Sequence, residues 1–242
     1  MGKAVNKNSS ISQYYNLRFE RKFILKGMYL EDIINSKVLT NEFQFREVYT
    51  NRGVNNIYFD DSNYNSYKQN VSGDGIRKKF RLRWYGDEFS KAINPTLEIK
   101  KKFGEVGDKY SFKLHNFKLN IDNFSIDEIR QKIIAEINKV GNKELAFSFQ
   151  NLFPTLFNKY ERRYFLSACG RFRITLDYNM KFYNPNYKNY TLSEHLLDDD
   201  ETIFELKYKT QYDNESRRLT QQLNKRISKN SKYVKGIDII TN

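Results

Sequence analysis

The amino-acid sequence predicts an α+β fold in which an antiparallel β-sheet closes into a barrel with a charged lumen and with helices packed outside. Many segments have the composition of strands, whereas only four have the periodicity of helices. Five strand segments alternate charged and large apolar residues, and successive side chains of a strand point to opposite faces. A barrel would enclose the charged face and pack the apolar one. The charged rows are Arg18-Glu20-Lys22, Lys79-Arg81-Arg83, Glu98-Lys100-Lys102, Arg171-Arg173-Asp177 and Glu205-Lys207-Lys209.

The expected strands are rich in β-branched and aromatic residues and are separated by turn-forming residues. Successive strands of this length and spacing indicate antiparallel pairing rather than a parallel sheet with crossover helices. We expect strands at about 16–26, 44–50, 54–60, 77–86, 95–103, 109–119, 159–167, 170–178, 181–183 and 201–210.

The four expected helices each carry an apolar stripe or an end signal. Segment 125–140 is the clearest, because Ser125 and Glu128 form a capping box ahead of isoleucines at helical spacing. Segment 143–153 ends before Pro154, which a helix interior does not tolerate. Segments 28–39 and 215–229 place their aliphatic residues on one face, namely Leu30, Ile33, Ile34 and Val38 in the first and Leu219, Leu223 and Ile227 in the second.

Composition indicates the class of partner. The net charge of +13 predicts an anionic ligand, although the lysine bias typical of proteins from AT-rich genomes accounts for part of it. With one cysteine and two histidines, an internal disulfide is impossible, and a histidine metal site or a Ser-His-Asp hydrolase is not indicated. No apolar run approaches ~20 residues, and the first residues lack the apolar core of a signal peptide. We therefore expect a cytoplasmic protein with a flexible tail, 1–14, and one domain, 15–242.

The most specific local pattern is Arg81-Leu82-Arg83. Its two arginines share a strand face about 6.5–7 Å apart, a spacing that suits two neighbouring phosphate groups, each held by a planar guanidinium. On this strand alone, a solvated basic face would explain the pattern as well. The other basic strands favour the phosphate interpretation.

Two segments, Glu98-Ile99-Lys100 and Glu205-Leu206-Lys207, put a carboxylate and an ammonium on the same strand face. They could be cross-strand salt bridges, worth ~0–1 kcal/mol if exposed. Alternatively, a glutamate holds Mg²⁺ or Mn²⁺ through oxygen and the lysine contacts a phosphate. Segment Arg18-Glu20-Lys22 is similar, with a second cation in place of a carboxylate.

In their order along the chain, these segments resemble the polyphosphate polymerase domain of the VTC (vacuolar transporter chaperone) family, and the chain is similar to a bacterial-type, stand-alone member. That family belongs to the triphosphate tunnel metalloenzyme, or CYTH-like, superfamily. The segment from Arg81 to Gly86 is the most diagnostic. The other matching segments are Phe19-Glu20-Arg21-Lys22, Ile57-Tyr58-Phe59-Asp60, Leu97-Glu98-Ile99-Lys100, Tyr160-Glu161-Arg162, Arg173-Ile174-Thr175-Leu176-Asp177, Phe204-Glu205-Leu206-Lys207 and Ser231-Lys232-Tyr233-Val234-Lys235.

The resemblance implies an eight-stranded antiparallel tunnel that transfers the γ-phosphate of ATP to a growing inorganic polyphosphate chain with Mn²⁺ or Mg²⁺. It implies ATP and polyphosphate or pyrophosphate as partners, no specific nucleic acid, and leaves protein partners open. By resemblance, Glu205 ligates the metal, with Glu98 and Glu20 as the next candidates. The implied catalytic residues are Lys22, Arg81, Arg83, Lys100, Arg162 and Lys207, and further phosphate-binding residues are Arg18, Arg173, Lys232 and Lys235.

Arg18 is a departure from the superfamily, whose first strand has Glu-x-Glu-x-Lys. The change removes a carboxylate that would help a metal activate water, and it adds a group suited to holding phosphate. It therefore favours the polymerase over a metal-dependent tri(poly)phosphatase of the same fold. A non-catalytic polyanion-binding tunnel or a general nucleic-acid binder would also account for the positive charge. A non-catalytic tunnel does not explain the retained glutamates, and a nucleic-acid binder does not explain the period-two pattern.

Overall fold

The computed structural model describes residues 18–104, 106–139, 141, 143–197 and 200–241, so the predicted tail, 1–14, lies outside the described residues. The strands are β1 (Arg18–Leu25), β2 (Arg46–Asp60), β3 (Ile76–Tyr85), β4 (Lys91–Ile93), β5 (Thr96–Phe103), β6 (Val106–Lys113), β7 (Lys118–Asn120), β8 (Phe153–Leu166), β9 (Arg173–Tyr183), β10 (His195–Leu196) and β11 (Thr202–Lys209). The main sheet is antiparallel, in the order β1-β11-β9-β8-β2-β3-β5-β6, and β10 pairs with β9. Strands β4 and β7 form a separate two-stranded sheet.

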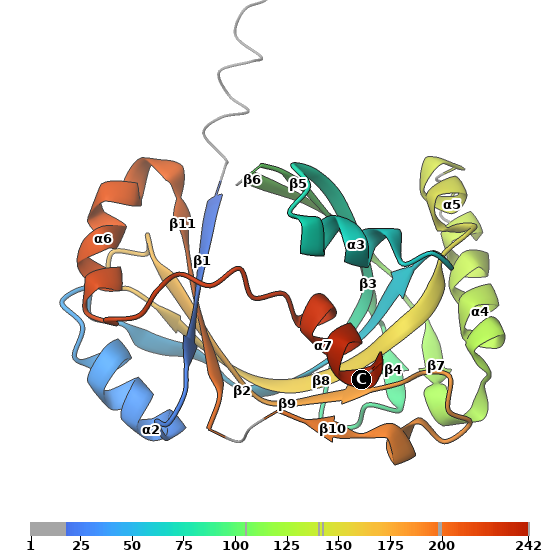
Figure 1. Ribbon diagram of the computed structural model, residues 1–242, viewed down its shortest axis with the longest axis horizontal. Coiled ribbons are helices and arrows are strands. Elements are labelled where there is room, and N and C mark those ends of the chain that lie inside the picture. Colours follow the sequence, from blue (N-terminus) through green and yellow to red (C-terminus); the bar gives the residue numbers. More distant parts are fainter. Residues whose placement is uncertain (1–17, 105, 140, 142, 198–199, 242) are drawn as a thin grey trace, which may run out of the picture.

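The main sheet curves into a deep trough, with β1 and β11 on one side and β3, β5 and β6 on the other (Figure 1). The edge strands β1 and β6 come within 8 Å between Cα atoms, but no backbone ladder joins them in the described part of the chain. Instead, the Lys100 Nζ on β5 lies 2.9 Å from Glu20 Oε2 on β1. The α+β class and the antiparallel sheet are confirmed. The expected closed barrel is not formed by the described residues: charged side chains bridge the gap between β1 and β6, which we call the seam.

Three strands are longer than the sequence indicated. β2 runs unbroken through the expected gap between 50 and 54, because register shifts at Glu47/Tyr49 and Tyr49/Arg52 absorb the irregular residues. β8 begins at Phe153, so Pro154 lies inside a strand, beside a third register shift where its missing N–H is tolerated. β9 joins the two segments that had been expected at 170–178 and 181–183.

The helices are α2 (Leu30–Ile33), which continues as the π-helix η1 (Ile34–Leu39), α3 (Asn65–Ser72), α4 (Ile126–Lys139), α5 (Lys143–Phe149), α6 (Asp213–Gln221) and α7 (Lys232–Thr241). Short 3₁₀ turns are η2 (Ile121–Asn123), η3 (Tyr190–Ser193) and η4 (Thr210–Tyr212). The capping box of α4 is confirmed: the Ser125 amide donates to Glu128 Oε2 at 2.7 Å, and the Glu128 amide donates to Ser125 Oγ at 3.3 Å. Helices α3 and α7 were not predicted.

Two apolar clusters cover the convex face of the sheet, as the alternation predicts. One packs α4 and α5 against the outward side chains of β3 and β5, such as Leu82 and Leu97. The other packs α2, η1 and α6 against β1, β9 and β11, for example against Leu206. Burial of these rows fixes the strand register, so the alternating charged residues must face the concave side.

A third cluster fills part of the concave side, where α7 lies in the trough (Figure 1). Tyr233 and Ile237 of α7 pack there with Tyr58, Leu156 and Tyr160. A Cβ on Gly236 would lie 2.4 Å from Leu156 Cδ2 and 2.7 Å from Phe182 Cδ1, so a larger residue would have to displace these buried side chains. A central glycine also lowers helix propensity, which is one reason that the sequence does not indicate α7.

Candidate functional site

The concave face encloses a cavity of about 100 Å³ beside α7. Four of the five predicted period-two rows, those on β1, β3, β5 and β11, converge on it, whereas the row on β9 does not line it. Strands β2 and β8 add the remaining strand residues of the lining. The structure brings together most of the candidate residues, namely Glu20, Lys22, Arg81, Arg83, Glu98, Lys100, Arg162, Glu205, Lys207 and Lys232. The other lining residues are Tyr58, Lys79, Tyr160, Ser231 and Tyr233.

Positive charge dominates this cavity. Eight lysines and arginines line it with three glutamates, which gives a formal charge of +5. Like charges enclosed in so small a space repel one another, and low-dielectric walls strengthen the field. The arrangement is therefore suited to a compact, multiply charged anion.

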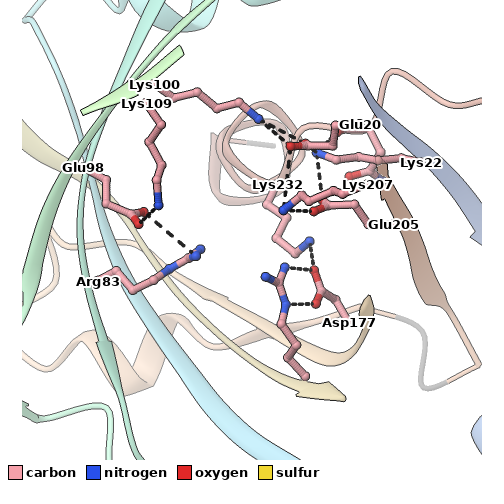
Figure 2. A network of polar contacts seen from close by, with 12 residues as sticks. Glu20, Lys22, Arg83, Glu98, Lys100, Lys109, Asp177, Glu205, Lys207 and Lys232 are labelled. Carbon is pink, nitrogen blue, oxygen red and sulfur yellow. Dashed lines mark hydrogen bonds and ion pairs between the residues drawn. The ribbon is translucent and has the colours of Figure 1, made fainter. Parts of the chain in front are cut away.

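The β1–β11 side carries a compact set of alternating charges (Figure 2). Directly opposed residues have opposite signs: Glu20 pairs with Lys207, and Lys22 with Glu205. Lys22 Nζ lies 3.0 Å from Glu20 Oε1 and 3.6 Å from Glu205 Oε2. Burial and Glu205 act to raise the pKa of Glu20, but Lys22, Lys100 and Lys207 outweigh them and hold it well below its usual range. Burial also opposes ionisation of Glu205, but Lys207 and Lys22 keep its pKa low.

The β3–β5 side holds Glu98 among cations (Figure 2). Arg81 Nε donates to Glu98 Oε2 at 2.5 Å, and Lys109 Nζ donates to Oε1 at 2.8 Å. Arg83 donates to Asn56 Oδ1 at 2.9 Å and to the Tyr160 hydroxyl at 3.0 Å. Burial acts to raise the pKa of Glu98, but Arg81, Arg83 and Lys109 outweigh it and lower the pKa. These hydrogen bonds orient the guanidinium groups of Arg81 and Arg83.

A buried carboxylate lies beneath the cavity. Asp177 on β9 is fully buried, and its Oδ2 accepts from Arg162 at 2.7 Å and from Lys232 at 2.5 Å. Burial acts to raise the pKa of Asp177, but Arg162 and Lys232 hold it below its usual value. Asp177 therefore positions one cation from β8 and one from α7.

The start of α7 is fixed by polar contacts. The Tyr233 hydroxyl donates to Asp60 Oδ2 at 2.7 Å, and Asp60 also accepts from the backbone amides of Ser66 and Tyr67 at 2.9 Å, at the start of α3. Lys79 Nζ donates to Ser231 Oγ at 2.7 Å. The segment before α7 is thereby held over the cavity, which brings Lys232 inside.

Three predicted phosphate-binding residues do not line the cavity. Arg18 and Arg173 are exposed at the starts of β1 and β9, although each shares the inward parity of its strand. Lys235 forms an ion pair with the buried Glu201, which also lies 3.1 Å from Lys26. In contrast, Lys79 lines the cavity but had no assigned role, although its parity with Arg81 and Arg83 could have indicated it.

The glutamates fit a divalent metal only on the β1–β11 side of the cavity. Glu205 Oε1 is buried and forms an ion pair with Lys207, whose Nζ lies 2.5 Å away. Glu20 is a neighbouring carboxylate, because Lys22 Nζ contacts both groups and Glu205 acts to raise the pKa of Glu20. No group of three or more metal-ligating side chains occurs among the described residues. A metal here would thus take one or two carboxylates and complete its shell with other oxygens, as Mg²⁺ commonly does.

The family follows from comparison of the sequence with known families. The sequence model of the VTC domain matches residues 17–241, nearly the whole chain. The chain belongs to the VTC domain family. None of the curated proteins matches it. In the described part of this VTC domain, no helix is long and apolar enough to span a membrane.

Solved structures with a similar chain trace are distant in sequence. A Vibrio parahaemolyticus protein described as a candidate adenylate cyclase is 13% identical, with 93% of this chain and 98% of that chain covered and a TM-score of 0.49. A protein from Pyrococcus horikoshii is 10% identical, with 92% and 97% covered and a TM-score of 0.49.

Proposed function

We propose that this VTC domain is a metal-dependent phosphotransferase that transfers the γ-phosphate of ATP to the end of an inorganic polyphosphate chain. The observation that carries the proposal is the cavity charge of +5, held on side chains oriented by buried partners. A cavity of this kind binds linked phosphates through ion pairs and charge-assisted hydrogen bonds. Membership of the VTC domain family supports the same class of ligand.

The cations have distinct roles in this proposal. Arg81 and Arg83 hold neighbouring phosphates on the β3 side, while Lys22, Lys100, Lys207 and Lys232 neutralise charge from the other sides. Phosphoryl transfer needs mainly alignment and charge stabilisation. The acceptor oxygen of a polyphosphate chain is already an anion, so the reaction needs no strong base. The lining residues include no histidine.

Mn²⁺ or Mg²⁺ would be held by Glu205, with Glu20 as the second carboxylate. The two carboxylates share the Lys22 ammonium, which supports this choice, whereas each oxygen of Glu98 already accepts from a cation of β3 or β6. When bound, the metal would neutralise charge on the phosphate oxygens. Lys22, which contacts both carboxylates, would keep them ionised and in place.

A triphosphatase of the same fold is the second candidate. The proximity of Glu20 to Glu205 favours it, because two carboxylates beside a metal also suit the activation of water. The two candidates bind the same phosphates and differ in the acceptor, so the products distinguish them.

The test incubates purified protein with ATP and Mn²⁺ and separates the products by chain length. We expect ADP and a ladder of polyphosphate, with free phosphate as a minor product. Release of orthophosphate alone, from ATP or triphosphate, would contradict the polymerase function and support the triphosphatase function.

Thermal melting with triphosphate tests binding separately. A ligand at a hundredfold excess over Kd adds about 2.7 kcal/mol, or roughly 5–10 °C for a chain of this size. A rise without any product would indicate a non-catalytic polyanion-binding protein. No rise at millimolar triphosphate would contradict a phosphate-binding cavity.

A further inference from the structure

Three tyrosines surround one arginine next to the phosphate cavity. The Arg52 guanidinium carbon lies 4.5 Å from the ring centroid of Tyr49 and 5.9 Å from those of Tyr85 and Tyr164. The Tyr49 and Tyr164 rings meet edge to face, with centroids 5.5 Å apart. In the described part of the chain, Arg52 forms no ion pair with a carboxylate. We call these four residues the Arg52 cluster.

A β-bulge directs this cluster toward the cavity side. Tyr49 pairs with Tyr164 and Arg52 with Arg162, so three steps along β2 oppose two steps along β8. Without the extra residue, Tyr49 and Arg52 would point to opposite faces. With it, both share the face of Arg162, which lines the cavity. Bulges often redirect side chains at the rims of barrels and beside active sites.

The Arg52 cluster extends from the edge of the cavity to the solvent-exposed surface. Tyr164 lies two residues after Arg162 on β8, and Tyr85 two residues after Arg83 on β3, so each is about 6.5–7 Å from a cavity arginine along its strand. The Arg162 guanidinium carbon lies 5.8 Å from the Tyr164 centroid. Tyr49 and Tyr85 are each 52% exposed. The exposed rings therefore lie directly beyond the arginines that line the cavity.

Hydrogen bonds and a close contact between two glycines hold the backbone at this edge. Gly86, directly after Tyr85, donates its amide to the Gly53 carbonyl at 3.1 Å, and its own carbonyl accepts from Asn55 Nδ2 at 2.8 Å. A Cβ on Gly53 would lie 2.4 Å from the Gly86 oxygen, so the contact depends on glycine. Tyr85 and Arg52, each next to one of these glycines, are thus held in a fixed relation.

We infer that the Arg52 cluster binds the base of the nucleoside triphosphate whose phosphates occupy the cavity. A flat base stacks on tyrosine rings or on a guanidinium plane, whatever its identity. One ribose separates the base from the phosphates, and the cluster lies just beyond the cavity arginines. Half-exposed rings are available to such a ligand, and Arg52 needs no carboxylate when its partners are aromatic. The inference rests on the proposed function and specifies a nucleotide donor rather than a bare phosphate chain.

The test compares the Kd values of ATP and inorganic triphosphate, measured by calorimetry with Mn²⁺. For the double variant Tyr49→Ala and Tyr85→Ala, we expect the Kd of ATP to rise about tenfold or more, from the loss of stacking. The Kd of triphosphate should change less than about twofold, because the cavity is intact. Tyr85→Phe should bind ATP as the wild type does, since it keeps the ring. Tyr29→Ala, which removes an 85% exposed tyrosine next to α2, is the matched control.

Each other outcome overturns the inference. Equal weakening of ATP and triphosphate would assign the cluster to phosphate binding. Unchanged ATP binding in the double variant would show that the base does not bind to the Arg52 cluster. Triphosphate binding would still support phosphate binding in the cavity. If the wild type bound neither ligand, the proposed function would fail as well. Thermal melts of every variant without ligand show whether the fold is retained.

Discussion

The Glu98-Ile99-Lys100 segment of β5 and the Glu205-Leu206-Lys207 segment of β11 have the same pattern but different surroundings. On β11, Lys207 turns back to its own Glu205 at 2.5 Å. On β5, Lys100 instead reaches across the seam to Glu20, and Glu98 is held by Arg81 and Lys109. Glu205 thus lies between lysines of β1 and β11, whereas the oxygens of Glu98 accept from cations of β3 and β6.

The difference shows that equal local patterns take different roles according to the strands beside them. β11 lies next to β1, which adds a second carboxylate, Glu20. β5 lies next to β3, which adds two guanidinium groups. We therefore expect the β1–β11 side to hold the metal and the β3–β5 side to hold phosphate, with Glu98 orienting the arginines.

Exchanging Glu205 for glutamine would have the largest effect. Glu205→Gln should lower phosphotransfer with Mn²⁺ roughly 100-fold or more, because the charge stabilisation by a metal is worth several kcal/mol and ~1.4 kcal/mol is tenfold. The affinity for triphosphate without metal should be kept. Glu98→Gln, the matched control, should stay within roughly tenfold of the wild type, because Gln still accepts from Arg81. Equal losses in both variants would contradict the division into two sides.

Arg83→Lys sharpens the comparison on the phosphate side. The charge remains, but the planar fork and its bonds to Asn56 and Tyr160 are lost. We expect the Kd of triphosphate to rise roughly tenfold or more, since a hydrogen bond to a charged group is worth about 1.5–3 kcal/mol. Arg163→Lys on the outer face of β8, where Arg163 pairs with Glu47, is the control and should leave the Kd unchanged. An unaltered Kd for Arg83→Lys would show that the bound phosphates do not contact β3.

Lys79 makes triphosphate binding sensitive to pH. Burial lowers its pKa well below the usual value of 10.5, and Lys22, Lys100, Arg77 and Arg81 lower it further. Only the protonated amine attracts an anion, so the affinity should fall as pH rises through this depressed range, by up to roughly tenfold. Lys79→Arg keeps its charge and should lose this part of the decline. Kd values are measured over a range of pH on both proteins with the same ligand, so the titration of triphosphate itself affects both profiles equally. Parallel profiles would show that Lys79 does not contact the anion.

Arg18→Glu should have the smallest effect. Arg18 lies on the strand of the metal side but is exposed and outside the cavity. Exposed substitutions away from partners usually change energies by about 0.5 kcal/mol or less, so the ratio of free phosphate to polyphosphate should change about twofold at most. A clear shift toward orthophosphate would show that Arg18 reaches the bound ligand, as its position in the family pattern suggested.

Strand parity explains why much of the cavity could be predicted from the sequence. Side chains of a strand alternate by covalent geometry, and outer rows such as Leu82 and Leu206 must be buried. Arg81, Arg83, Glu205 and Lys207 then face the other side, whatever their neighbours are. The same argument failed for Arg18 and Arg173, because parity fixes the face but not how far along the tunnel a residue lies.

The sequence by itself determined the α+β class, the antiparallel sheet, helix α4 and the inward face of the strands that carry the charged rows, because these depend on local periodicity and capping. Only the tertiary structure decided the open seam bridged by Lys100 and Glu20, the placement of α7 inside the trough, and the pairing of Asp177 with Arg162 and Lys232. These features join residues far apart in the chain, and their energies depend on burial and on distances between charges. Local sequence carries neither quantity, so two identical Glu-x-Lys patterns acquire different partners only when the sheet curves.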